Sequence, residues 1–321
     1  MSPAAAFSLI VAIACAVVMG FAINRGATCM VSAVDEVVRK RRFTRFVALG
    51  EAALWVAGGI ALGSMVGLMP ETAPHPGLSA QTVVGGALLG LGAYVNKACV
   101  FGSVARFGSG EWHYALTPLG FLAGCVVALP WLGNAGVRPS ALHYPNFPLA
   151  VGIALTLFAL WRGIGVLLSA RAGMLARHIW APHQATAVIG VTFVILLLTA
   201  GMWTYPEALA QLARGMTMES SARLTLFVAL LAGAVWSGGG IRSGAGGWSG
   251  RRAMRCVAGG ALMGMGSLMI PGGNDSLILI GLPFLQPYAW AALAAMAGTI
   301  ALCLMAEERA QRMLDSLRRP H

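Results

Sequence analysis

Charged residues are scarce in this sequence. Only 10% of the 321 residues are Asp, Glu, Lys or Arg, whereas 58% are hydrophobic. A soluble globular protein usually carries about a quarter charged residues. The shortage therefore excludes a water-soluble domain, together with the enzyme folds that are built on soluble sheets.

Lysine is nearly absent, because Lys40 and Lys97 are the only two among 22 basic residues. A basic protein can bind nucleic acid, but in a membrane protein a surplus of arginine marks the cytoplasmic loops. We therefore predict no nucleic-acid partner.

Cysteine is also scarce, and the six cysteines include no Cys-x-x-Cys pair. This excludes a secreted disulfide framework and gives no support to a zinc site.

Recognisable catalytic patterns are missing as well. The sequence has no Ser-His-Asp order, no paired carboxylate motif and no phosphate-binding loop, and its histidines form no i, i+4 pair on a helix. We therefore predict no enzyme activity, no cofactor and no metal.

The sequence contains instead a series of apolar runs, and most are close to the roughly 20 residues that span a bilayer core. The predicted spans are residues 3–23, 46–70, 82–107, 115–131, 147–169, 187–205, 224–236, 256–286 and 288–305. The first run has no basic residue before it, so we expect it to be retained and not cleaved as a signal peptide. These runs predict an all-α polytopic membrane protein with one transmembrane domain over residues 1–321.

Basic clusters predict the orientation. The densest cluster lies at residues 39–45, and the positive-inside rule places it in the cytoplasm. The N-terminus is then outside, the loops at residues 71–81 and 135–146 are outside, and the C-terminal tail is cytoplasmic. The remaining clusters then fall on the cytoplasmic side; they contain Arg171, Arg177, Arg242, Arg251, Arg252, Arg255, Arg309, Arg312, Arg318 and Arg319.

Polar residues and glycines interrupt two of the spans, at residues 96–103 and at residues 271–276. A third polar segment, residues 24–30, follows the first span. Irregular backbone at membrane depth is tolerated only where it is buried in protein or lines a polar cavity. We therefore expect these segments to line a substrate pathway.

A short repeat precedes both interruptions. Residues 85–92 (GGALLGLG) match residues 259–266 (GGALMGMG) at six of eight positions. Small residues at four-residue spacing are also a general helix-packing motif, so packing alone is one interpretation. In the predicted topology the first copy runs inward and the second outward, which favours inverted repeats whose broken helices meet at mid-membrane. The predicted repeat halves are residues 1–146 and 147–321.

Two cations near the interruptions require an explanation, because an ionisable residue deep in a bilayer costs about 2.5–3.5 kcal/mol. Arg25 and Lys97 either reach an interface or face a cavity, where a passing anion supplies the missing charge. Asp275 is the candidate partner for Lys97. Helix N-termini expected near Val100 and Ser276 would add partial positive charge. The combination predicts a small anionic substrate.

Cys29 and Cys99 differ from the other cysteines, because each lies among small or polar residues close to a cation. A thiol is a weak donor and a soft, polarisable group. We expect the remaining four to be packing residues: Cys15, Cys125, Cys256 and Cys303.

The chain resembles, over nearly its whole length, the YeeE/YedE family of bacterial inner-membrane transporters for sulfur-containing compounds, including thiosulfate. The resemblance rests on residues 25–30 (RGATCM), on the first repeat followed by residues 98–103 (ACVFGS), and on the second repeat followed by residues 272–274 (GGN). It implies an hourglass in which broken helices meet at a constriction lined by three cysteines that pass thiosulfate inward. Cys29 and Cys99 match two of these positions, and Asn274 stands at the third.

The resulting prediction is a transporter in a bacterial inner membrane, with a periplasmic N-terminus, that imports a small sulfur-containing anion. The predicted substrate pathway is Cys29, Cys99, Asn274, Lys97, Arg25, Gly102, Ser103, Gly273 and Asp275. The alternative is a membrane thiol-redox or sulfur-relay protein, in which the two cysteines exchange persulfide with a cytoplasmic sulfur-carrier protein. Apart from these partners, we expect only contact with the lipid bilayer.

Overall fold

The computed structural model describes residues 3–27, 29–68, 77–132, 149–171, 179–215, 217–239, 249–270 and 272–317. This part of the chain is helical and contains no strand. Within it, six helices are long and apolar enough to cross a membrane, and one bent pair brings the number to seven. Two further predicted spans are shorter apolar helices, Gly152–Leu168 and Ser221–Ser237. The predicted polytopic all-α fold is confirmed.

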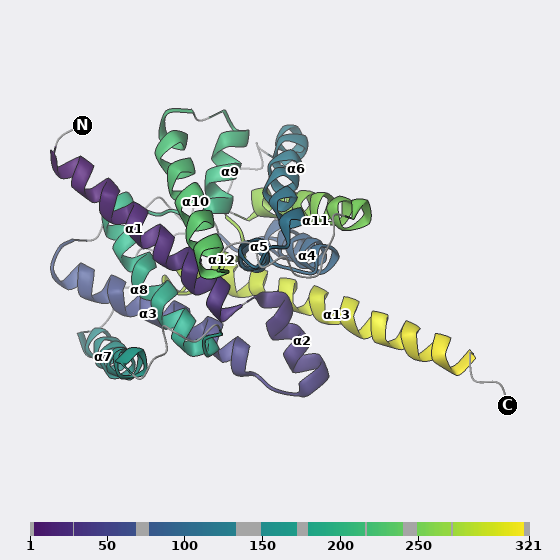
Figure 1. Ribbon diagram of the computed structural model, residues 1–321, viewed down its shortest axis with the longest axis horizontal. Helices are drawn as coiled ribbons and strands as arrows, with labels where there is room; N and C mark the ends of the chain where they lie inside the picture. Colours follow the sequence, from purple (N-terminus) through teal and green to yellow (C-terminus); the bar gives the residue numbers. More distant parts are fainter. Residues whose placement is uncertain are drawn as a thin grey trace.

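The helices follow a similar alternation of long and short elements twice along the chain, and Figure 1 shows how they are arranged. The first series is α1 (Pro3–Gly26), α2 (Met30–Lys40), α3 (Thr44–Met65), α4 (Ala80–Asn96), α5 (Val100–Gly108), the 3-10 turn η1 (Trp112–Ala115) and α6 (Leu116–Leu132). The second series is α8 (Pro182–Ala200), α9 (Tyr205–Ala213), α10 (Thr217–Ser237), α11 (Gly250–Met269), α12 (Asn274–Ser276), the π-helix η3 (Leu277–Gly281) and α13 (Pro287–Leu317). Between them, α7 (Leu149–Arg171) lies at the edge of the molecule.

Several sequence predictions fall outside the described residues. These are the expected outer loop at residues 135–146, residues 71–76 of the other expected outer loop, and Pro271. The same holds for some of the cations that support the orientation, namely Arg177, Arg242, Arg318 and Arg319.

Both predicted helix breaks are confirmed. The first falls between Asn96 and Val100, because Lys97 adopts the left-handed conformation (φ 60°) and ends α4. The second falls between Met269 and Asn274, where the helix pair is bent by 49°. α5 starts at Val100 as expected, whereas α12 starts at Asn274, two residues before the expected start at Ser276.

The prediction of one unbroken span over residues 187–205 is wrong. α8 ends at Ala200, Gly201 has φ 75°, and α9 begins at Tyr205. Glycine adopts positive φ without the steric penalty of a Cβ atom, and proline suits the first turn of a helix, where Pro206 lies. The chain therefore contains a break after α8 that matches the break after α1.

The two glycine repeats pack directly against each other. A Cβ atom at Gly92 would lie 2.6 Å from the carbonyl oxygen of Gly259, and one at Gly266 would lie 2.6 Å from that of Gly85. Residue numbers rise on one helix as they fall on the other, so α4 and α11 run antiparallel. Without side chains the two backbones approach closely, as in other membrane helix pairs. Helix packing is therefore one function of the repeat.

The outer helices are held by ion pairs as well as by apolar contacts. Arg162 of α7 donates to Glu51 of α3 at 2.7 Å and 3.0 Å, in a two-point contact. Arg39 of α2 lies 3.3 Å from Glu308 of α13. α13 extends beyond the other helices toward the C-terminus (Figure 1).

Candidate functional site

Four helix breaks supply the starts of four short helical segments in the interior. The residues that precede them are Cys29 before α2, Cys99 before α5, Thr204 before α9 and Gly273 before α12, and none has a side-chain capping hydrogen bond. The first amides of a helix have no intrahelical partner. The breaks therefore bring the starts of four helical segments, with their backbone N–H groups, into the protein interior.

The two predicted cysteines meet. The backbone N–H of Cys99 donates to Cys29 Sγ at 3.1 Å, and the N–H of Met30 donates to Cys99 Sγ at 3.3 Å. The exposed fractions of Cys29 and Cys99 are 4% and 0%. Each thiol thus lies at the start of the other cysteine's helix.

Gly102 makes room for this contact. A Cβ atom at residue 102 would lie 2.6 Å from Cys29 Sγ and 3.0 Å from Cys29 Cβ. Any larger side chain would push the thiol away from the start of α5. The structure therefore brings Gly102 together with the cysteines.

Ser103 supports the loop between α4 and α5. Its hydroxyl donates to the carbonyl of Cys99 at 3.0 Å and accepts from Asn96 Nδ2 at 2.9 Å. The same amide donates to the carbonyl of Ala98, and Thr117 donates to Asn96 Oδ1 at 3.2 Å. Since these bonds are buried and short, Asn96 and Ser103 fix the position of the Cys99 thiol.

A pair of hydroxyl groups occupies the corresponding place in the second series. The Oγ atoms of Thr204 and Ser276 lie 2.7 Å apart, and both residues are buried. Tyr205 connects the two places, because its hydroxyl donates to the carbonyl of Val100 at 2.8 Å. Sequence reasoning missed Thr204 and Tyr205, although Gly201 and Pro206 on either side were the available signal.

The predicted residues of the second break are buried there. Asn274 and Asp275 are each 1% exposed, and Gly273 packs against Pro206. Asp275 Oδ1 accepts the backbone N–H of Ser276 at 2.9 Å. Asn274 Oδ1 is buried without a hydrogen-bond partner in the described part of the chain. A buried acceptor of this kind is uncommon and suits a group that a ligand can satisfy.

The predicted pairing of Lys97 with Asp275 is wrong. Lys97 Nζ lies 3.1 Å and 3.3 Å from the two carboxylate oxygens of Glu307 in α13, and 4.2 Å from the ring centre of Tyr94. Tyr94 also donates to Glu307 at 3.0 Å. Because Lys97 ends α4 and points toward α13, it is held away from α12.

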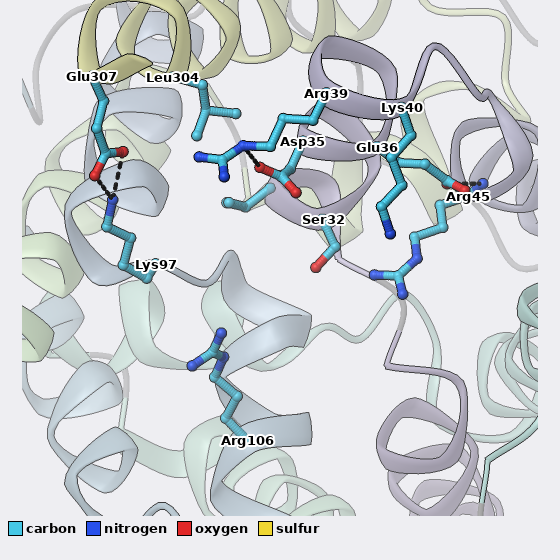
Figure 2. Close-up of a pocket in the computed structure, with 11 residues that line it drawn as sticks. Ser32, Asp35, Glu36, Arg39, Lys40, Arg45, Lys97, Arg106, Leu304 and Glu307 are labelled. Atoms are coloured by element: carbon cyan, nitrogen blue, oxygen red, sulfur yellow. Dashed lines mark hydrogen bonds and ion pairs between the residues drawn. The ribbon is translucent and has the colours of Figure 1, made fainter. Parts of the chain in front are cut away.

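Lys97 lines an open hollow, which we call the basic hollow, with a volume of about 350 Å³ (Figure 2). Its basic residues are Arg39, Lys40, Arg45, Lys97 and Arg106. Three acidic residues also line it, so positive charge predominates. Val31 and Ser32, in the first turn of α2 after Cys29, form part of its wall. The hollow therefore reaches to within one helical turn of the thiol pair.

Arg25 lies at the end of α1, apart from the basic hollow. Its Nε donates to Ser237 Oγ at 3.0 Å, and its guanidinium lies 5.0 Å from the ring centre of Phe21. Its carbonyl accepts the N–H of Trp180. Arg25 thus connects the ends of α1 and α10 with the segment that precedes α8.

The thiols of Cys29 and Cys99 and the hydroxyls of Thr204 and Ser276 are thus all buried at the starts of helices. A family model described as sulphur transport matches residues 25–302, which include all three segments of the noted resemblance. No curated protein sequence matches the chain. Because the match covers most of the protein, the chain belongs to the YeeE/YedE sulphur transport family of membrane proteins that carry sulfur compounds.

Proposed function

We propose that the protein imports a small sulfur-containing oxyanion of the thiosulfate class through a constriction at Cys29 and Cys99. The observation that supports this most strongly is the meeting of the two thiols at the starts of α2 and α5, where each sulfur accepts a backbone N–H. A thiol can donate a hydrogen bond to a passing anion, and its soft sulfur suits a sulfur-containing substrate. The protein acts as a transporter and not as an enzyme.

Asn274 supplies a different chemistry at the second break. An amide offers both a donor and an acceptor, so it can hold an oxygen of the anion but has no soft sulfur. The hydroxyls of Thr204 and Ser276 lie at the same break. We infer that the substrate passes from this oxygen-rich place to the thiols and then into the basic hollow.

We further infer that the two repeat halves, residues 1–146 and 147–321, are inverted. The packing of helices supports this, because α1 packs on α10 as α8 packs on α3, and α4 packs on α13 as α11 packs on α6. The antiparallel contact of the glycine repeats is what a two-fold axis between the halves requires. Among the described residues of the first half, α7 has no counterpart.

The proposed orientation follows the positive-inside rule. The basic hollow then opens to the cytoplasm of a bacterial cell, and the N-terminus of α1 lies in the periplasm. Positive charge at the inner mouth draws the anion forward from the thiols.

Uptake of radiolabelled thiosulfate tests the proposal, in cells that lack other uptake routes. We expect the wild-type protein to import thiosulfate and Asn274→Cys to retain or increase the rate, because a thiol replaces the amide. If the wild type imports none and only Asn274→Cys does, thiosulfate is not the substrate.

The basic hollow makes a separate prediction. Arg45→Gln removes one positive charge from its wall, so we expect thiosulfate entry from that side to slow several-fold at low salt and to recover partly at high salt. Inside-out vesicles provide the measurement. Arg309→Gln on α13, whose residue does not line the hollow, is the matched control. An equal effect of both variants would show that the hollow attracts no anion.

A sulfur relay is the second candidate, favoured by the contact between the two thiols. In that case one cysteine carries a persulfide, and an acidic cytoplasmic sulfur-carrier protein docks at the basic hollow. Mass spectrometry of the purified protein separates the two functions. A relay leaves an additional sulfur atom on Cys29 or Cys99, whereas conduction requires only reduced thiols.

A further inference from the structure

Asp275 places a carboxyl group in the interior, at the start of α12. It is 1% exposed, and in the described part of the chain no ion pair includes it. An unpaired negative charge in the interior of a membrane protein is costly and usually belongs to a functional site. A fixed negative charge would also repel the anion that the neighbouring groups are suited to hold.

In the part of the chain that the structure describes, no cation pairs with Asp275. From α9, Glu207 is the charged side chain that acts on it, with the same sign. Tyr205 of α9 also lies close, but its hydroxyl is used by the carbonyl of Val100. Cys99 and Cys29, which precede α5 and α2, are titratable groups that act on the same Tyr205. Lys97 is bound to Glu307.

The carboxylate lies beside the polar groups that are proposed to hold the anion at this break. Its Oδ1 accepts the N–H of Ser276, whose hydroxyl is paired with Thr204. A substrate oxygen that approaches these groups meets a second negative charge at close range, which is strongly unfavourable in the interior. A proton on Asp275 removes that charge and turns the carboxyl group into a donor.

We propose that Asp275 carries the proton that accompanies the substrate, so that the protein is an anion–proton symporter. This inference depends on the proposed function. A proton from the outer solution binds the carboxylate as the anion enters, and it leaves to the cytoplasm after the anion has moved to the thiols. No bond of the substrate changes. One carboxyl group accounts for one proton per anion. A dianion and its proton together therefore carry one net negative charge into the cell.

The competing explanation is that Asp275 only satisfies an amide at the start of α12. Asp275→Asn separates the two, because asparagine keeps an acceptor for the N–H of Ser276 but cannot bind a proton. The protein is reconstituted in liposomes that contain a pH-sensitive dye, and radiolabelled thiosulfate is added outside. For the wild type we expect internal acidification with uptake, and faster uptake when the outside is made more acidic.

For Asp275→Asn we expect loss of both the acidification and the pH dependence, while exchange of thiosulfate across the membrane continues. Glu207→Gln, which changes the carboxyl group of α9 that acts on Asp275, is the matched control and keeps the coupling. A wild-type protein that exchanges thiosulfate without moving protons overturns this inference alone, and so does coupling that survives in Asp275→Asn. A wild-type protein that exchanges no thiosulfate contradicts the proposed function itself. The wild-type measurement stands even if Asp275→Asn fails to fold, which size-exclusion chromatography would detect.

Discussion

Cys99→Ala is expected to reduce thiosulfate uptake by about tenfold to a hundredfold, since a lost hydrogen bond to a charged group is worth about 1.5–3 kcal/mol. The thiol is fully buried and lies against the first amide of α2, where no other side chain caps the helix. Alanine leaves that amide without its sulfur partner and removes the donor for the passing anion. Cys29→Ala should act in the same direction, because its sulfur accepts the N–H of Cys99.

The control for both variants is Cys303→Ala. Cys303 lies on α13 and is partly exposed, and among the described residues no hydrogen bond at the helix breaks involves it. Uptake by this variant should equal that of the wild type at equal protein level. Undiminished uptake in Cys99→Ala would exclude a pathway lined by thiols.

Gly20→Ala is expected to destabilise the folded protein by about 1–3 kcal/mol or more, because overpacking forces backbones apart. A Cβ atom at Gly20 would collide with the carbonyl oxygen of Leu230 in α10, which cannot move like the end of a flexible side chain. α1 leads directly to the Cys29 break, so its displacement should also reduce uptake. Thermal unfolding in detergent measures the change.

Gly298→Ala is the matched control for this prediction. Gly298 lies inside α13, and a Cβ atom there would meet nothing within 4 Å. Since alanine favours a helix over glycine by about 1 kcal/mol, this variant should unfold at the same temperature as the wild type or higher. Equal destabilisation by both substitutions would mean that α1 and α10 are not closely packed.

The sequence predicted the helices and the two marked breaks because each leaves a local signal. The helices are marked by long apolar runs. The breaks are marked by Asn96 and Asn274, because an amide side chain within such a run cannot be satisfied by lipid. The break before Tyr205 was missed because Met202 and Trp203 continue the apolar character across it. A single glycine and a proline mark it, and both residues also occur within membrane helices.

Contacts between distant segments could not be predicted in the same way. Lys97 and Glu307 are separated by 210 residues, and nothing near either residue identifies the other. The sequence favoured Asp275 as the partner of Lys97, because the two residues lie at related helix breaks. In the structure, the left-handed end of α4 directs Lys97 toward α13 instead. The meeting of Cys29 with Cys99 was predicted only because the resemblance implied a shared constriction.

The most direct test of the account is protection of the cysteines by substrate. The purified protein is treated with N-ethylmaleimide with and without thiosulfate, and modification of Cys29 and Cys99 is measured by mass spectrometry relative to Cys303 in the same molecule. We expect thiosulfate to slow modification of the two thiols several-fold relative to Cys303, while chloride at equal ionic strength does not. If thiosulfate leaves the rates of modification of Cys29 and Cys99 relative to Cys303 unchanged, the substrate does not pass between Cys29 and Cys99.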